Sequence, residues 1–199
     1  MATAFTPNEN MAIKQTLKTY ARKYMMQYGI KKTSVDQLVA AANISKGSFY
    51  KFYPTKELLF FEVIEESHQE LYLFALDVLK KHGTLPIVER LTETILDIFH
   101  FMRDMLFMPN MENELNYLMR KLPPDILNQH MKDETSVFER ILMDSGINLS
   151  IDSDLLATIV HIFTLIHCYP PSNEDAHYEE ALRIIVHGFS RELVDNYIT

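Results

Sequence analysis

Four side chains of one short segment could bind a polyanion. Lys46 and Lys51 carry ammonium groups, Ser48 and Tyr50 carry hydroxyls, and no acidic residue stands within residues 44–56. Ammonium groups bind phosphate oxygens, and hydroxyls donate hydrogen bonds to phosphates or to the edges of bases. The segment therefore indicates contact with nucleic acid.

Positive charge is concentrated at the N-terminal end of an acidic chain. The 199-residue sequence has a formal net charge of −8. Residues 1–56 nevertheless hold nine Lys or Arg and two Asp or Glu, a net of +7, which leaves ten basic and 25 acidic residues, a net of −15, for the remainder. Affinity for DNA depends on local neutralisation of phosphates, so this asymmetry is more informative than the pI. A solvated basic face would explain the charges alone, but not the helical pattern around them.

Two short helices joined by a tight turn would position these side chains. Thr33 or Ser34 can cap the first helix, and Ser45 can cap the second. Asn43 occupies the turn, where asparagine tolerates a positive φ. In a helix-turn-helix, the N-terminal residues of the second helix lie over base edges in the major groove. Gly47 is at that end, and its lack of a side chain would let the backbone approach the duplex.

This segment resembles the DNA-binding region of the tetracycline-repressor (TetR) family of bacterial transcriptional regulators, over about residues 10–60. The resemblance implies an N-terminal helix-turn-helix DNA-binding domain, residues 1–56, and a larger effector-binding and dimerisation domain, residues 57–199. It also implies contacts with operator DNA along the capped ends and outer face of the two short helices. The residues expected to make them are Thr33, Ser34, Ser45, Lys46, Gly47, Ser48, Tyr50, Lys51 and Lys56.

Three positions depart from the family pattern. Asn43 stands where the family usually has Gly, and Phe52 lacks the polar tip of the His or Tyr that is common there. Tyr53 stands where the family usually buries Phe, so its hydroxyl must reach a partner or solvent.

Apolar periodicity predicts an all-α chain of about nine helices. The five glycines and eight prolines fall mostly between periodic segments and leave little room for hairpins. Residues 1–8 are expected to form a loose arm, followed by a helix that ends at Gly29. No linker separates the two domains, so a continuous helix from Thr55 to about Lys81 should join them. Further helices are expected over residues 86–108, 111–122, 124–145, 153–168 and 174–197.

Titratable residues show no recognisable catalytic pattern. His161 and His167 are six residues apart and do not share a helix face, so with Cys168 they favour core or interface roles over a metal site. A Gly-rich phosphate loop and a nucleophile elbow are both absent from the sequence. We therefore expect no enzyme, no cofactor and no metal.

Cysteine content and hydropathy indicate a soluble protein of the cytoplasm. The single cysteine excludes an internal disulfide and fits a reducing compartment. The longest apolar run, residues 159–169, is well short of the roughly 20 residues of a membrane span. A basic-then-apolar leader is also missing, so we expect no membrane partner.

Methionine and aromatic residues interleave in the middle of the chain. Seven of the eleven methionines lie between residues 102 and 143. Methionine adapts to varied shapes, so such a region can line a pocket, although ordinary core packing explains any single residue. With the resemblance, the set predicts a small apolar or aromatic effector, which Asn113 and His161 would orient. The expected pocket residues are His68, Tyr72, Phe99, Met102, Met105, Asn113, Tyr117, Phe138 and His161.

Gly188 lies inside the final expected helix. An interior glycine costs about 1 kcal/mol relative to alanine, and close approach of another helix would compensate. Packing within the subunit explains it as well. The family resemblance implies that this helix contributes to a dimer interface, at Ala181, Ile185, Gly188 and Phe189.

These features predict a homodimeric regulator that binds a palindromic operator and is released from it by an effector. The alternative is a small-molecule sensor or carrier whose DNA affinity is non-specific, with an enzyme as a more distant third. Activation instead of repression also stays open, because the sign depends on the position of the promoter.

Overall fold

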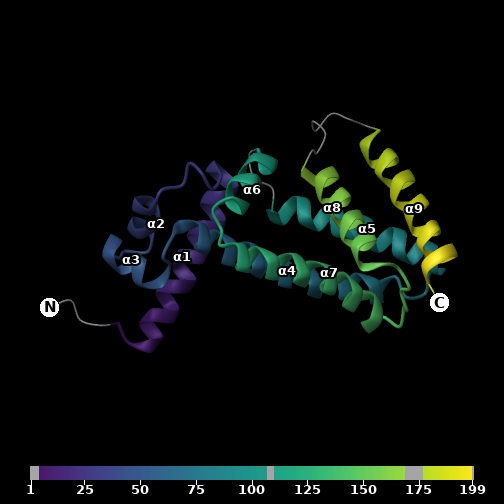
Figure 1. Cartoon of the computed structure of the whole chain (residues 1–199), viewed down its shortest axis with the longest axis horizontal. Coiled ribbons are helices and arrows are strands. Elements are labelled where there is room, and N and C mark those ends of the chain that lie inside the picture. The colour runs from purple at the N-terminus through teal and green to yellow at the C-terminus, as the bar shows by residue number, and fades with distance from the viewer. Residues whose placement is uncertain (1–4, 107–109, 169–176, 199) are drawn as a thin grey trace. The chain divides into compact units, whose positions relative to one another are not determined.

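The computed structural model describes residues 5–106, 110–168 and 177–198. Within these residues the chain forms nine α-helices and no β-strand, and Leu149 and Ile198 form an isolated antiparallel bridge (Figure 1). The all-α prediction is therefore confirmed. The chain divides into a first unit, Met1–Ser67 with Leu106–Pro124, and a second unit, His68–Met105 with Asp125–Thr199. The functional division after residue 56 stays a prediction.

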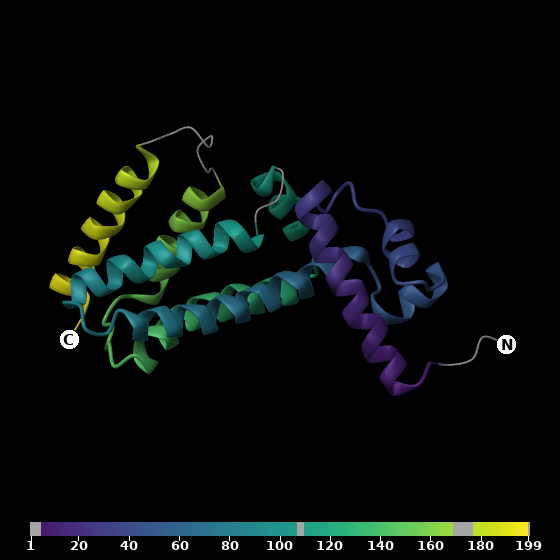
Figure 2. The same cartoon turned by 180° about the vertical axis from the view of Figure 1, so that it is seen from behind.

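The first unit contains α1 (Pro7–Tyr28), α2 (Val35–Ala41), α3 (Lys46–Phe52), the beginning of α4 (Lys56–Lys81) and α6 (Met111–Met119). Figure 2 shows α1 with α2 and α3 from behind. Leu17, Ala21 and Met25 are buried on α1, as are Leu38 and Phe49 on the short helices. Helices of seven residues are too short to be stable alone, so burial of these side chains must hold α2 and α3 in place.

The turn between α2 and α3 has the predicted backbone conformation. Asn43 adopts a φ of 53°, in the left-handed region that asparagine tolerates. Gly29 ends α1 with a φ of 84°, as expected of a glycine at a helix C-terminus. The backbone conformations of these two residues set the direction of the chain after α1 and after α2.

The start of α1 differs from its prediction. The helix begins at Pro7, inside the segment that was expected to be a loose arm. Thr6 caps it: its hydroxyl accepts a hydrogen bond from the Glu9 backbone N–H, and the Glu9 carboxylate accepts one from the Thr6 backbone N–H. This reciprocal capping box, with proline at the first helical position, stabilises a first turn of polar residues that apolar periodicity does not reveal.

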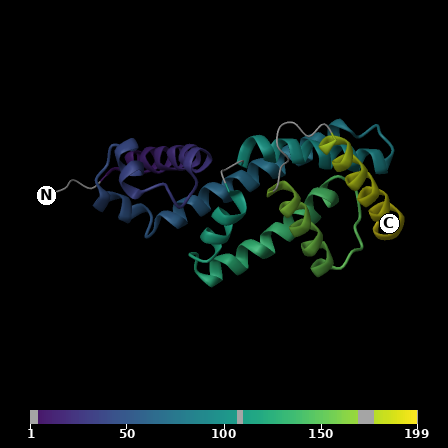
Figure 3. The same cartoon turned by 90° about the horizontal axis from the view of Figure 1, so that it is seen from above.

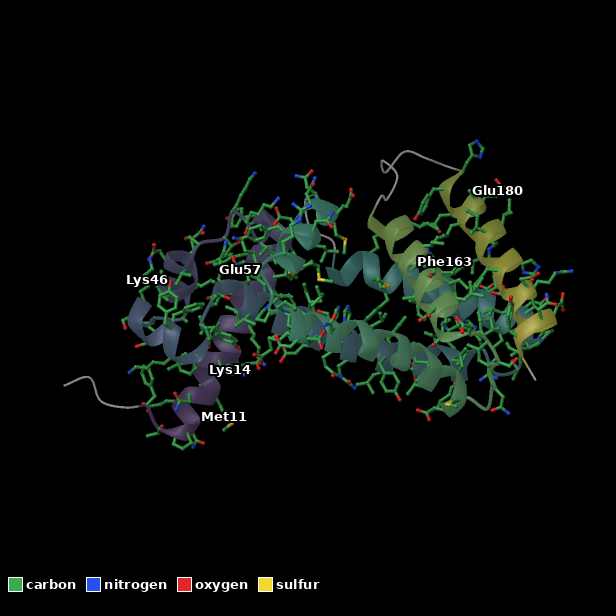
Figure 4. All side chains as sticks on the ribbon, viewed as in Figure 1. Met11, Lys14, Lys46, Glu57, Phe163 and Glu180 are labelled. Atoms are coloured by element: carbon green, nitrogen blue, oxygen red, sulfur yellow. The ribbon has the colours of Figure 1, made fainter. Side chains whose placement is uncertain are left out.

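The second unit contains the remainder of α4 with α5 (Ile87–Leu106), α7 (Pro124–Asp144), α8 (Ser153–Cys168) and α9 (Tyr178–Tyr197). The α4 residues Ala75 and Leu79 pack with Ile141 and Leu142 of α7. A second cluster joins α5 to α9, with α8 packed against it, and Figure 3 shows α9 beside α5 from another direction. Phe163 of α8, labelled in Figure 4, contacts the rings of Phe99 and Phe189 edge to face.

The helix limits after residue 106 differ from the predictions in two places. The α6 helix ends at Met119 and not at residue 122, because consecutive prolines at 123 and 124 disfavour helical geometry just before them. Among the described residues, α9 begins at Tyr178, and its expected first residues, 174–176, lie outside them.

Candidate nucleic-acid interface

The N-terminal end of α3 is exposed and held by its cap. The Ser45 side chain accepts a hydrogen bond of 3.1 Å from the Ser48 backbone N–H, and the two hydroxyl oxygens are 2.9 Å apart. Lys46 lies at the outer side of this end (Figure 4), with its Nζ 3.1 Å from the Asp36 carboxylate of α2. This helix end thus carries the exposed Ser45 hydroxyl, the half-buried Ser48 hydroxyl and the exposed Lys46 ammonium group.

Gly47 has no internal neighbour that would require glycine. A Cβ built on Gly47 would meet only the Ser45 hydroxyl oxygen, at 3.9 Å, which is an ordinary van der Waals distance. Its φ does not lie in the left-handed region. Folding therefore does not explain this glycine, whereas close approach of the backbone to an external surface would.

Tyr50 and Lys51 continue the exposed face of α3, while Phe49 anchors the helix. Phe49 is fully buried, and the Tyr50 ring packs edge-on against it at 5.4 Å between centroids. Tyr50 is 50% exposed, so the phenol remains accessible at a fixed place. An ordered hydroxyl beside Lys51 suits contact with a phosphate or a base.

Ser34 caps α2 through a reciprocal capping box. Its hydroxyl accepts from the Gln37 backbone N–H at 3.2 Å, and the Gln37 side-chain oxygen accepts from the Ser34 backbone N–H at 2.8 Å. Of the two residues that sequence left open for this cap, the structure selects Ser34. The side chain remains exposed at a helix N-terminus, a place that favours anions.

Thr33 and Lys56 face the interior of the first unit. The buried Thr33 hydroxyl donates to the Gly29 carbonyl at 2.8 Å. The Lys56 ammonium donates to the carbonyls of Ile30, Lys31 and Thr33 at 2.7 to 3.1 Å, which uses all three of its hydrogens. Burial lowers the pKa of Lys56, opposed by nearby Glu57 and Glu114. Both residues stabilise the loop before α2, and their contact with DNA stays a prediction.

Tyr53 is buried, and its hydroxyl does not reach solvent. The side chain is 4% exposed, and the hydroxyl makes no hydrogen bond of normal geometry, although it lies near the Glu62 carboxylate. Burial and this carboxylate raise the pKa of Tyr53. The Lys14 Nζ lies 2.9 Å from a carboxylate oxygen of Glu62 and 5.6 Å from the centre of the Tyr53 ring. The tyrosine thus fills the place of a buried aromatic at the cost of a buried hydroxyl without a regular hydrogen bond.

A buried carboxylate of α6 supports the loop that precedes α2. Glu114 is 7% exposed and accepts a hydrogen bond of 2.8 Å from the Lys31 backbone N–H. A Cβ at Gly29 would approach its carboxyl carbon to 2.9 Å, so the loop and α6 fit closely. This residue was missed by sequence reasoning, because 83 positions separate the two partners.

The residues predicted to line an effector pocket are divided between the units. In the first, Asn113 is exposed, and the Tyr117 hydroxyl donates to Glu57 at 2.5 Å. Burial, together with Glu57, raises the pKa of Tyr117 to about 12. In the second, Phe99 is buried, and the Tyr72 hydroxyl donates to Asp144 at 2.8 Å. His68 and Met102 are half-buried, and the side chains of Met105, Phe138 and His161 lie outside the described residues.

Three of the four predicted interface residues lie on an exposed face of α9. Ala181, Ile185 and Gly188 are exposed, whereas Phe189 packs on Phe163 inside the unit. A Cβ at Gly188 would meet nothing within 4 Å, so packing within the described part of the subunit does not explain this glycine.

Comparison with known proteins accounts for the arrangement of α1 to α4. Residues 19–63 match the family model described as bacterial regulatory proteins, tetR family. The chain is therefore similar to TetR-family proteins over this segment. Its matched segment includes the turn at Asn43 and the whole of α3, so the helix-turn-helix prediction is confirmed.

Solved structures of TetR-family regulators share the fold. A regulator from Mesorhizobium loti has 16% sequence identity and a TM-score of 0.60 over 98% of this chain and 100% of its own. RolR in complex with resorcinol has 17% identity and a TM-score of 0.58, over 96% and 97% of the two chains. A regulator from Haemophilus influenzae has 14% identity and a TM-score of 0.53, over 94% and 99%. At these identities the likeness establishes the fold alone.

No curated protein sequence matches this chain. In the part of the chain that the structure describes, none of the helices combines the length and apolar character that crossing a membrane requires.

Proposed function

We propose that this protein is a homodimeric repressor of the TetR family that leaves a palindromic operator when a small apolar or aromatic effector binds. The observation that carries the DNA-binding part is the N-terminal end of α3. It carries the exposed Lys46 and Tyr50 and the half-buried Ser48 around a glycine that folding does not require. A recognition helix places such residues over base edges and phosphates in the major groove.

The dimer is supported by the outer face of α9. Ala181, Ile184, Ile185 and Gly188 follow helical spacing and are all exposed, with Ile184 at 68% and Ile185 at 52%. Two isoleucines exposed on one helix face favour burial against another surface. On α8, Leu155 and Ile162 add exposed apolar side chains in the same unit. A second copy of the chain would bury both sets around a two-fold axis.

The effector is supported by the composition of the second unit and by one structural neighbour. Aromatic side chains from α4, α5 and α8 are buried or half-buried there, including Phe74 stacked on Phe101 at 4.1 Å between centroids. RolR is described as a complex with resorcinol, a small phenol. Release from DNA requires that the effector bind the two states of the dimer with different affinities.

A DNA-binding assay tests the first part of this proposal. In Lys46→Ala/Tyr50→Ala, we expect loss of specific binding to the DNA upstream of the protein's own gene, measured by gel shift. Lys80→Ala, which removes an exposed lysine at the other end of α4, is the matched control and should bind normally. Unchanged affinity of the double variant would contradict the proposal.

The salt dependence of the same assay separates the alternative function. A specific regulator retains sequence preference as salt is raised, whereas a sensor with non-specific DNA affinity loses binding to all sequences in parallel. Mass spectrometry of small molecules that co-purify with the protein would identify the effector. A dimer that carries no ligand and ignores phenolic compounds would contradict the effector class.

A further inference from the structure

Two histidines from different helices meet inside the second unit. The rings of His68 on α4 and His130 on α7 lie parallel within 16°, with their centroids 5.3 Å apart. His130 is 7% exposed and His68 is half-buried, so the pair is largely shielded from solvent. Sequence spacing could not reveal this pair, because its members are 62 residues apart and only the packing of α4 beside α7 joins them.

The positions of the ligand atoms suit a metal ion. A ring nitrogen of His68 and one of His130 lie within 4.8 Å of each other. Glu65 stands three residues before His68 on α4, hence on the same helix face, and its carboxylate lies within 4.8 Å of a ring nitrogen of His68. In tetrahedral zinc coordination with Zn–N distances of 2.0–2.1 Å, two nitrogens lie about 3.4 Å apart. The rings are stacked nearly parallel, so both must rotate for their nitrogens to converge on one ion.

We propose that His68 and His130, with the carboxylate of Glu65, bind a divalent transition-metal ion of the Zn²⁺ or Co²⁺ class. Imidazole and carboxylate together suit these ions, whereas Ca²⁺ and Mg²⁺ prefer oxygen ligands throughout. Three protein ligands leave the fourth tetrahedral position for water or for an oxygen of another molecule. A bound ion would bridge α4 to α7 near the start of both segments in the second unit.

Spectroscopic titration of the full-length protein with Co²⁺ tests this site directly. We expect one ion per chain, with the intense visible bands of tetrahedral Co²⁺, and displacement by Zn²⁺. In His68→Gln or His130→Gln, the affinity should fall by roughly tenfold or more, because each change removes a direct ligand. The matched control is His177→Gln, which alters an exposed histidine at the start of α9 and should leave the affinity unchanged.

Glu65→Gln decides the third ligand. A weakened complex supports the carboxylate, and unchanged affinity overturns its role while retaining the histidine pair. A wild-type protein without visible bands, or with equal affinity in the histidine variants and the control, overturns the site.

Nuclear magnetic resonance covers the case in which a variant fails to fold. In the unaltered protein, Zn²⁺ should shift the imidazole resonances of His68 and His130 before those of the other histidines. Shifts confined to the other histidines would overturn the proposal. Both measurements are made without DNA, so their result is independent of whether the protein represses a promoter.

Discussion

Gly47 is a residue at which folding and DNA binding can be separated. A methyl group there meets no internal obstacle, and alanine is favoured over glycine in a helix. Gly47→Ala should therefore leave the free energy of unfolding unchanged or raise it by up to about 1 kcal/mol. If the backbone at this point approaches the duplex, operator affinity should fall roughly tenfold, equivalent to about 1.4 kcal/mol. Gel shift and chemical denaturation on one sample give both numbers, and a variant with full affinity would show that the duplex stays farther away.

Tyr53 provides a second test, in which a hydroxyl is removed without loss of the ring. A buried hydroxyl without a regular hydrogen bond contributes no net stability, so Tyr53→Phe should be neutral or stabilising by about 1 kcal/mol. Tyr28→Phe, at an exposed ring of α1, is the control. Destabilisation well beyond about 1 kcal/mol would show that Glu62 accepts a strong hydrogen bond from this hydroxyl.

The same variant should change the response to alkaline pH. The pKa of Tyr53 is raised in the folded protein, so above the ordinary value of about 10 the unfolded chain loses this proton first. The folded state then binds more protons than the unfolded state, and stability falls as the pH rises. Denaturation at pH values around 9 to 11 should show a shallower fall in Tyr53→Phe than in the parent. Identical slopes would contradict the raised pKa.

At the scale of elements, the caps of α2 and α3 stabilise these helices, and the same capped ends are predicted to bind DNA. Ser34→Ala removes one half of a capping box on a seven-residue helix and should cost about 1 kcal/mol. Ser34→Asp should retain most of that stability, since aspartate also caps helices. Because Ser34 is predicted to lie near a phosphate, however, the added negative charge should weaken DNA binding. A Ser34→Asp variant that binds DNA as well as the parent would place the phosphate elsewhere.

The local elements could be predicted because their signals are local. The residue types of Gly29 and Asn43 predicted positive φ values, and Ser34 and Ser45 were predicted as helix caps. The apolar spacing predicted the positions of the helices. The capping box of Thr6 and Glu9 was also readable, but it lies in a polar stretch without apolar periodicity.

The inner roles of site residues could not be read in this way. Lys56 binds carbonyls more than twenty positions away, and Glu114 binds the Lys31 amide from another helix. Only tertiary packing decides that these charges face inward, whereas Lys46 and Lys51, with equal charge, face solvent.

At the scale of the whole molecule, the exposed face of α9 should decide the oligomeric state. Ile185→Glu places a charge at the centre of the proposed interface and should convert the dimer to a monomer in sedimentation experiments, since burying an unpaired charge is costly. Operator affinity should fall with it, because a monomer occupies a single half-site. Met143→Glu, at an equally exposed apolar residue of α7, is the control and should stay dimeric. Persistence of the Ile185→Glu dimer would assign the interface to another surface.

The ion pair between Lys46 and Asp36 has a consequence for how the protein meets a duplex. In the unbound molecule this ammonium already has a carboxylate neighbour 3.1 Å away. If Lys46 binds a phosphate as proposed, one anion would replace another, and Asp36 would be left facing a polyanion of its own sign. A base edge that offers Asp36 a hydrogen-bond donor, such as the amino group of cytosine, would remove that repulsion. One carboxylate could thus penalise most sequences while accepting a few, so discrimination at this end of the helix would rest on a residue that attracts no DNA by itself.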